Sequence, residues 1–310
     1  MFYEYAVDPQ IISSWETARY FLDSFGPWEG RFLADFPTDW RAHVRDHLKT
    51  VSNCREVERL RIIERINRID KRTLSSRLGA KYIKEKSFLD NAEIEHVRVP
   101  RREFRAIISL VASVGKQHIL QGDSLDKSNP RWGTETGFLV NRDSASIIST
   151  LYTLISLSKH IVIIDPHFRA NRTEKSIVLE AICGALPSSG VKVDVHSRLG
   201  EDKDPDYHWL RSEIERKLPR KIPRGLTVRF SFWKERENGP RLHNRYLITD
   251  IGGIKFGDSI EQDKAGKQDH LSILDEQSRL SLWQHYMDPG DGFEPVEMPI
   301  EIVGVKNSGK

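Results

Sequence analysis

Residues 241–250 are the part of this chain whose residue types and spacing best suit a chemical reaction. His243 stands two residues before Arg245 and seven before Asp250, and Gly257 follows seven residues later. If the stretch is a strand, His243 and Arg245 point to the same face, because side chains alternate along a strand. A nucleophilic imidazole beside a fixed positive charge suits attack on phosphorus. The spacing therefore indicates a site that cleaves phosphodiesters.

The pattern His-x-Lys-x4-Asp, with Gly-Ser seven residues after the acid, marks the phospholipase D superfamily. This chain resembles it: His243, Arg245 and Asp250 stand at the motif positions, and Gly257 stands at the glycine. The preceding order of a helix, an Ile-Val-Ile-Ile-Asp-Pro strand, a second helix and a Val-Lys-Val-Asp-Val strand is also similar to the first half of such a unit. The resemblance covers roughly residues 138–290 and implies an α/β domain with a mixed sheet.

Three positions depart from the family pattern. Arg245 replaces the lysine, Asp258 occupies the serine position beside Ser259, and Glu261 stands where many members carry asparagine. An arginine keeps the charge and can hold two phosphate oxygens, whereas the acids would repel a phosphate unless they are turned away or protonated. These changes are also similar to the phospholipase D-like domain that follows microtubule-interacting-and-transport modules, a branch that binds membranes without known catalysis.

The resemblance implies a mechanism. His243 would form a covalent phosphohistidine, and Arg245 would stabilise charge on the phosphate oxygens. Asp250 would orient its histidine or pack nearby, and a second histidine would protonate the leaving oxygen. Members with one motif take that histidine from a symmetry mate, which implies a homodimer. His167, just past a predicted strand, is a candidate for that histidine within one chain, and packing at the rim of the cleft, where the family often has an aromatic residue, is the alternative. No metal or other cofactor is expected.

Further residues are candidates for binding the substrate. Gly257 and Ser259 belong to the motif region, Trp233 could stack on a base, and Arg241 lies close to it in sequence;. Packing in the core or at the rim is the alternative for Trp233. Two basic clusters could bind a nucleic-acid backbone or anionic lipid headgroups, or be solvated loops: Arg98, Arg101, Arg102 and Arg105, and Arg216, Lys217, Arg220, Lys221 and Arg224.

Composition limits the function classes. The 310 residues are 38% apolar and carry a net charge of only +3, which excludes a uniformly basic nucleic-acid coat but not local patches;. Cys54 and Cys183 are too few for a disulfide framework and lack metal-ligand spacing, so a reducing cytoplasm is the simplest compartment. We find neither a signal-peptide pattern nor an apolar run long enough to cross a membrane.

The hydrophobic pattern predicts two domains in an α/β protein. Residues 1–121 are expected to be mainly helical, with helices over 9–25 and 55–70, and with 104–114 either strand or helix. In the second of these helices one apolar stripe is expected to hold Val57, Leu60, Ile63 and Ile66;. The turn-rich segment 122–137 is expected to be a linker. Residues 138–310 alternate strands and helices, with strands expected over 160–165, 191–196, 226–233 and 242–249.

Three hypotheses follow. The first is a cytoplasmic, metal-independent nuclease with one motif per chain, acting as a homodimer, with a role in bacterial defence that rests on the resemblance alone. The second is an inactive module that holds a phosphate group of nucleic acid or lipid, or a partner protein. The third is an interaction subunit whose N-terminal region docks another protein. If Asp258 and Glu261 both face the pocket of His243 and Arg245, catalysis is excluded.

Overall fold

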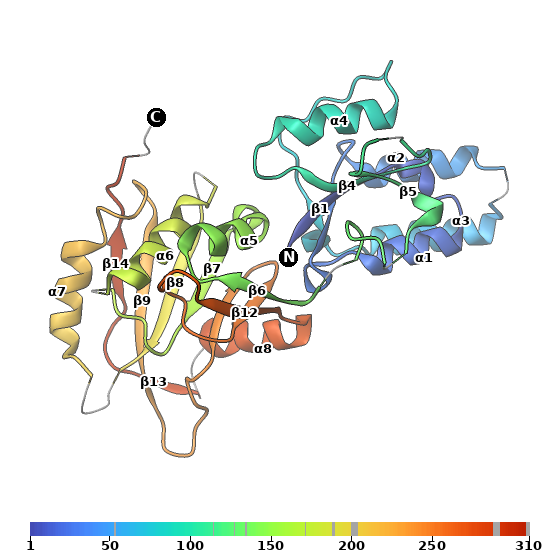
Figure 1. Cartoon of the computed structure of the whole chain (residues 1–310). Coiled ribbons are helices and arrows are strands. Elements are labelled where there is room, and N and C mark those ends of the chain that lie inside the picture. Colours follow the sequence, from blue (N-terminus) through green and yellow to red (C-terminus); the bar gives the residue numbers. More distant parts are fainter. Residues whose placement is uncertain are drawn as a thin grey trace. The chain divides into compact units, whose positions relative to one another are not determined.

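The computed structural model describes residues 1–52, 54–113, 115–126, 128–133, 135–170, 172–187, 190–199, 204–287 and 292–307. The chain divides into two compact units, Met1–Thr136 and Gly137–Lys310. Each unit has its own sheet and its own helices (Figure 1). The α/β fold class predicted from the sequence is therefore confirmed.

A five-stranded parallel sheet lies at the centre of the described part of the N-terminal unit. Its strands are β1 (Tyr3–Val7), β2 (Arg31–Ala34), β3 (Leu74–Ser75), β4 (Phe104–Ser109) and β5 (Ile119–Gln121). They lie in the order β3-β2-β1-β4-β5, and neighbouring strands are parallel. The expectation of a mainly helical region missed this sheet, although β4 resolves the ambiguous run at 104–114 as a strand.

Helices cover both faces of this sheet: α1 (Trp15–Ser24), α2 (Trp40–Thr50), α3 (Glu56–Asn67) and α4 (Phe88–Arg98). The first three share a core with Tyr5 and Val7 of β1, whereas α4 packs with Ala6 on the opposite face. This division follows from the alternation of side chains along β1. Ser14 begins α1 with a capping box, and the side chain of Asp39 caps α2;.

The buried side of α3 is narrower than the predicted apolar stripe. Ile62 and Ile66 are fully buried and Ile63 is partly buried, but Val57 and Leu60 are 80% and 61% exposed. The helix contacts α1 and α2, and only its C-terminal half reaches the core. Helical periodicity identified the helix correctly but not how much of the stripe is covered.

Residues 122–136 belong to the N-terminal unit and are not the linker expected over 122–137. Trp132 is only 1% exposed and lies in the core beside β1. Its indole N–H donates to the hydroxyl of Tyr20 at 2.8 Å, and the Arg31 guanidinium lies over its ring. A buried tryptophan anchors the segment to the unit, so the turn-forming residues around it shape a packed loop. The boundary lies between Thr136 and Gly137.

The C-terminal unit contains a nine-stranded mixed sheet among its described residues. Its strands are β6 (Gly137–Asn141), β7 (His160–Ile164), β8 (Lys192–Arg198), β9 (Thr227–Glu235), β10 (Arg245–Thr249), β11 (Gly253–Phe256), β12 (Gln268–Ile273), β13 (Phe293–Pro295) and β14 (Ile300–Val303). β7, β8 and β9 are parallel, and the other pairings are antiparallel. The predicted strands correspond to β7, β8, β9 and β10, except that β10 begins only at Arg245.

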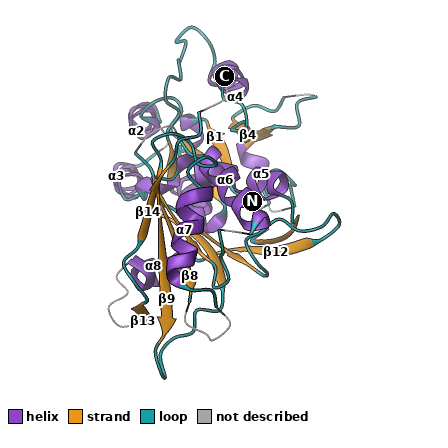
Figure 2. Ribbon diagram, turned by 90° about the vertical axis from the view of Figure 1, so that its left-hand side faces the viewer, coloured by secondary structure: helices purple, strands orange, loops and turns teal. Residues whose placement is uncertain are grey.

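Four helices pack on this sheet: α5 (Ser144–Leu157), α6 (Thr173–Gly184), α7 (Tyr207–Lys217) and α8 (Glu276–Met287). In Figure 2, α8 lies on one side of the strands and α5, α6 and α7 lie on the other. Tyr286 of α8 shares a core with Val162, Ile164 and Ile248.

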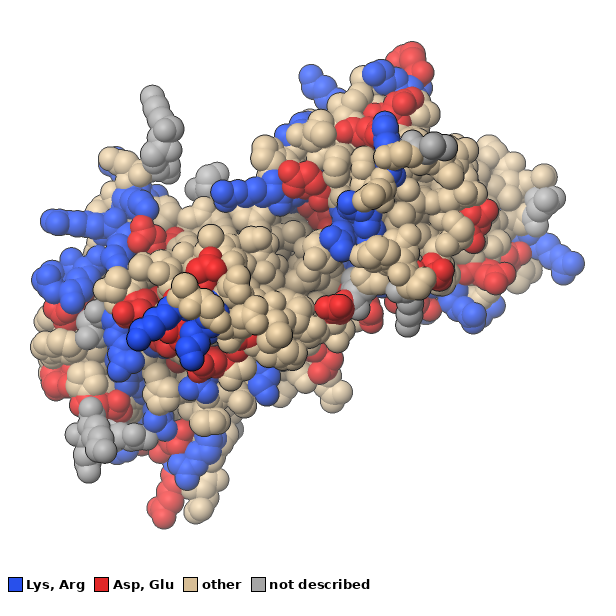
Figure 3. Space-filling view, in the orientation of Figure 1, with Lys and Arg blue, Asp and Glu red and all other residues tan. Residues whose placement is uncertain are grey.

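Charges of both signs are interspersed over the face drawn in Figure 3, in keeping with the net charge of +3. Among the described residues, no helix is both long enough and apolar enough to cross a bilayer.

Candidate phosphate-binding edge of the C-terminal sheet

Two histidines lie at one edge of the C-terminal sheet. β10 runs antiparallel to β7, with Tyr246 opposite Ile164. His243 precedes Tyr246 by three residues and His167 follows Ile164 by three residues, so both lie where β7 ends and β10 begins. Sites in α/β sheets gather at the carboxyl ends of parallel strands such as β7.

The exposed His243 is held by its backbone neighbours. Leu242 is 1% exposed in the core, and its N–H donates to Glu235 Oε1 at 2.9 Å. Arg241 donates to Glu235 Oε2 at 2.6 Å. Burial acts to raise the pKa of Glu235, but these hydrogen bonds and the charge of Arg198 outweigh it and lower that pKa. Glu235 is therefore an anion at neutral pH that fixes the chain just before His243.

Arg245 lies beside His243, but not through strand alternation. Because β10 begins at Arg245, His243 is outside the strand and the same-face argument does not apply. The Arg245 Nη1 instead donates to the backbone carbonyl of His243 at 3.0 Å. Its Nε is buried and has no hydrogen-bond partner among the described residues. The guanidinium therefore lies at the start of β10 and keeps an N–H donor that no described residue uses.

His167 is surrounded by positive charge. Its backbone N–H donates to Asp165 Oδ1 at 2.9 Å. Burial lowers the pKa of His167; the nearby Asp165 opposes this, and the charges of Arg198, Arg245 and Lys175 lower it further. The imidazole is therefore neutral at pH 7. The same cations would attract an anion to this edge.

A buried ion pair lies at the end of β7. Lys175 of α6 is 1% exposed, and its Nζ donates to Asp165 Oδ2 and to Ser259 Oγ, both at 2.5 Å. Ser259 in turn donates to Asp165 at 3.1 Å. The hydroxyl predicted to bind substrate is thus engaged with the buried pair. Sequence reasoning predicted neither Lys175 nor Asp165 as part of the site.

Arg142, directly after β6, forms ion pairs with the two acids that depart from the family pattern. It contacts Asp258 at 2.6 Å, Glu261 at 3.1 Å and Asp263 at 2.9 Å. Glu261 also lies 3.4 Å from the Nζ of Lys175. Within the described part of the chain, neither Asp258 nor Glu261 contacts His243 or Arg245. Asp258 is thus tied to Arg142, and Glu261 is tied to both Arg142 and Lys175.

Gly257 and Trp233 have structural roles. A Cβ at Gly257 would lie 2.8 Å from the Asp269 carboxylate and 3.1 Å from the His270 carbonyl, so only glycine fits this approach of β11 to β12. Trp233 is 7% exposed, stacks on His196 and donates to its Nδ1 at 2.9 Å. Its ring is covered and cannot stack on a base, which corrects the prediction that it binds substrate.

Asp250 is at the wrong end of β10 to assist His243. Five residues of extended chain place it about 16 Å from Arg245. Its Oδ1 accepts hydrogen bonds from the backbone N–H groups of Lys159 and His160, at 2.9 and 3.2 Å. The catalytic role predicted for Asp250 is wrong: this carboxylate holds the start of β7 against the end of β10.

We expect Asp250→Ala to lower the free energy of unfolding by about 1–2 kcal/mol, because two backbone donors lose a charged acceptor. Urea denaturation measures this change. Asp250→Asn, which keeps an oxygen acceptor, is the matched control and should lose less. Wild-type stability in Asp250→Ala would show that the two hydrogen bonds contribute nothing.

The sequence gives only weak signs that Asp165, Lys175 and Arg142 belong to the site. Asp165 ends a strand, where site residues are common, but Lys175 looks like a solvated residue in the first turn of a helix. Arg142 precedes a helix with no motif of its own. Their roles arise from contacts between elements far apart in the chain.

Most of the basic residues singled out earlier make internal contacts. Arg98 pairs with Glu95, Arg102 pairs with Glu4, and Arg105 donates to a backbone carbonyl. In the second cluster, Arg216 and Lys217 both pair with Glu213, and Lys221 donates to Ser176.

A hollow of about 730 Å³ lies beside the chain that leads into β10. Arg241 and Glu235 line it together with Lys234, Arg236, Glu237, Asn238 and Glu294. Arg241 thus faces an open space, as a substrate-binding residue would, while His243 lies outside the lining. Among the described residues, no group of three His, Cys, Asp or Glu side chains is placed to hold a metal ion.

No family model and no curated protein matches the chain. A comparison of structures finds a similarity to TrmBL2, an archaeal chromatin protein whose structure shows a novel mode of DNA binding. The identity is 14%, the TM-score is 0.27, and the match covers 54% of this chain and 56% of that one. This chain therefore spans about half the length of the matched protein, and at this TM-score the similarity supports no conclusion on fold or function.

Proposed function

We propose that the C-terminal unit is a phospholipase D-like phosphodiesterase that cleaves nucleic acid without a metal ion. The observation that supports this best is that the strand pairing places His243 and His167 at the same end of β7 and β10, where Arg245 and Arg198 carry positive charge near His167. The family resemblance supplies the chemistry, and the ion pairs of Asp258 and Glu261 with Arg142 are compatible with it.

In the proposed reaction an imidazole nitrogen of His243 attacks phosphorus and the bond to the leaving oxygen breaks. His167 gives that oxygen its proton. A bound phosphodiester anion offsets the cations around His167 and raises its pKa, so this imidazole gains its proton as substrate binds;. Water, deprotonated by His167, then attacks the phosphohistidine and releases His243. Arg245 stabilises the charge on the phosphate oxygens.

The experiment compares cleavage of labelled single- and double-stranded DNA and RNA in EDTA by the full chain and three variants. His243→Ala and His167→Ala are expected to lose cleavage, because each removes a group that forms or breaks a bond. His208→Ala is the matched control, since His208 is an exposed histidine of α7 that has no role in the proposed reaction. Equal cleavage by wild type and His243→Ala would refute the proposed nuclease.

A phosphate-binding module without chemistry is the second candidate. It is favoured by Ser259, which is engaged with Lys175 and Asp165, and by Asp250, which lies at the opposite end of β10. For this candidate, the wild type binds the same nucleic acids without cleaving them, the affinity falls steeply with salt, and Arg245→Ala weakens it.

The homodimer implied by the resemblance is also part of the proposal. His167 offers a partner for His243 within one chain, so the two sources of the second histidine can be separated. Mixing His243→Ala with His167→Ala restores cleavage only if the two residues act across two chains. Sedimentation equilibrium of the wild type gives the oligomeric state.

A further inference from the structure

The N-terminal unit has a topological switch point of its own. In the order β3-β2-β1-β4-β5, the chain moves outward in one direction from β1 to β3 and then returns to β4 on the other side. Open parallel sheets bind ligands outside the carboxyl ends of the strands at this point. A cavity of about 690 Å³ opens there. Asp8 follows β1, Pro37 follows β2, Ser109 ends β4, and all three line the cavity.

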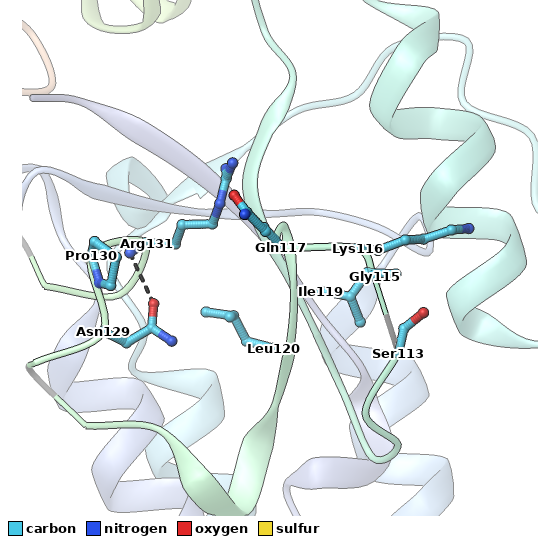
Figure 4. A pocket seen from close by; sticks show the side chains of 9 residues that line it. All are labelled: Ser113, Gly115, Lys116, Gln117, Ile119, Leu120, Asn129, Pro130 and Arg131. Atoms are coloured by element: carbon cyan, nitrogen blue, oxygen red, sulfur yellow. Dashed lines mark hydrogen bonds between the residues drawn. The ribbon is translucent and has the colours of Figure 1, made fainter.

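A second hollow in this unit is a weaker candidate. It measures about 570 Å³ and is lined by the loop before β5 and by residues 129–131 (Figure 4). The loop leads into the amino end of β5, which is not the ligand-binding end of a parallel sheet. Its cations are already engaged, since Lys116 pairs with Glu93 and Arg131 donates to a backbone carbonyl.

The floor of the 690 Å³ cavity carries buried polar groups. Asp8 is 7% exposed and accepts a hydrogen bond from the Gln10 N–H at 3.0 Å. Burial raises the pKa of Asp8, against the opposing effects of that N–H and of His47. The Nε2 of His47 is buried and has no hydrogen-bond partner among the described residues. Buried polar atoms of this kind normally find partners, and a ligand would supply one here.

The remaining walls combine positive charge with aromatic rings. Lys84 and Lys86 line the cavity from the loop after β3, and within the described residues neither makes an ion pair. Asp46, which also lines it, already pairs with Lys49 at 2.7 Å. The ring of Tyr82 lies against His43, with centroids 6.2 Å apart. The cavity thus offers free cations, a flat aromatic wall and a buried carboxylate.

We propose that this cavity binds a nucleotide. Lys84 and Lys86 contact the phosphates, the base packs against Tyr82, and Asp8 accepts a hydrogen bond from a ribose hydroxyl or a base amine. Its volume is within the range of roughly 300–1,000 Å³ common for small-molecule sites. The turn after β1, which begins with Asp8, lacks the glycines of a dinucleotide fingerprint, so lysine side chains replace backbone N–H groups at the phosphates;. This site is independent of the proposed phosphodiesterase.

The test is isothermal titration of the full chain with ATP, GTP, CTP and UTP, and separately with adenosine and inorganic phosphate. At least one nucleoside triphosphate is expected to bind. Lys84→Ala/Lys86→Ala should weaken it by about tenfold or more, because charge-assisted contacts are lost, and should leave binding of the free nucleoside unchanged. Tyr82→Ala should weaken nucleotide and nucleoside alike. Lys116→Ala and His243→Ala are controls that should bind as wild type does.

Absence of binding by every triphosphate at about 1 mM would overturn the proposal. So would wild-type affinity in Lys84→Ala/Lys86→Ala, or inorganic phosphate binding as tightly as a triphosphate, which would reduce the site to an anion site. Thermal unfolding of each variant without ligand shows whether a lost affinity reflects a lost fold. Because the His243→Ala control keeps this site intact, nucleotide binding and nuclease activity succeed or fail separately.

Discussion

Lys175→Met is expected to lower the free energy of unfolding by about 3–5 kcal/mol, the usual cost of leaving one member of a buried ion pair alone. Lys175 and Asp165 are 1% and 0% exposed, and 2.5 Å separates their charged atoms. Methionine fills the space of the lysine stem but cannot neutralise Asp165. Ser259 and the His167 N–H remain as donors to that carboxylate, and two neutral hydrogen bonds do not replace the charge;.

Urea denaturation at pH 7, followed by tryptophan fluorescence, measures this loss. The double variant Asp165→Asn/Lys175→Met removes both charges and should recover much of the stability, since replacing a whole buried pair costs far less than breaking it. Lys255→Met, at an exposed position on β11, is the matched control and should change stability by less than about 0.5 kcal/mol;. A loss below about 1 kcal/mol for Lys175→Met would contradict the burial of this pair.

The second large effect is a loss of stability in mild acid that arises from His196. Burial lowers the pKa of this imidazole from 6.5 to about 4. The unfolded chain therefore binds a proton at a pH where the folded chain does not. Above pH 6.5 His196 is neutral in both states and does not reduce stability. As the pH falls from 6.5 toward 4, the free energy of unfolding decreases by a total of roughly 3 kcal/mol;.

The variant His196→Asn isolates the effect of His196 on how stability depends on pH. Asparagine keeps an oxygen near the position of Nδ1, which accepts the hydrogen bond from the Trp233 indole, but it does not titrate;. The variant is less stable than wild type at pH 7 because the ring stacking is lost, yet its stability should fall less between pH 6.5 and 4. Parallel stability curves for the two proteins over that range would show that His196 titrates normally.

Four of the nine strands of the C-terminal sheet, β7 to β10, could be predicted because runs of five to nine apolar or alternating residues mark them. The pattern identified β7 and β8 within two residues at each end. The N-terminal sheet escaped prediction because β3 has only two residues and β5 only three, too few to show an alternation. Parallel strands buried on both faces also lack the polar positions that mark a half-exposed strand.

The candidate site could be predicted only where neighbours in sequence remain neighbours in space. His243 and Arg245 are such a pair, since the Arg245 guanidinium donates a hydrogen bond to the backbone carbonyl of His243. Asp250 is not, because an extended strand carries it to the far end of the sheet. Lys175 and Asp165 lie on different elements, and only the packing of α6 against β7 brings them together. Spacing in the sequence does not encode that contact.

The position of β1 has a consequence for how the chain is made. β1 is synthesised before the other strands of its sheet, yet it is the central one, and it pairs with β2 on one side and β4 on the other. Roughly 100 residues separate β1 from β4, so at translation speeds of 5–20 residues per second β1 waits about 5–20 s for that neighbour. During this interval the ribosome holds an apolar strand with an open edge. The N-terminal unit is therefore the part of the nascent chain that a chaperone would protect.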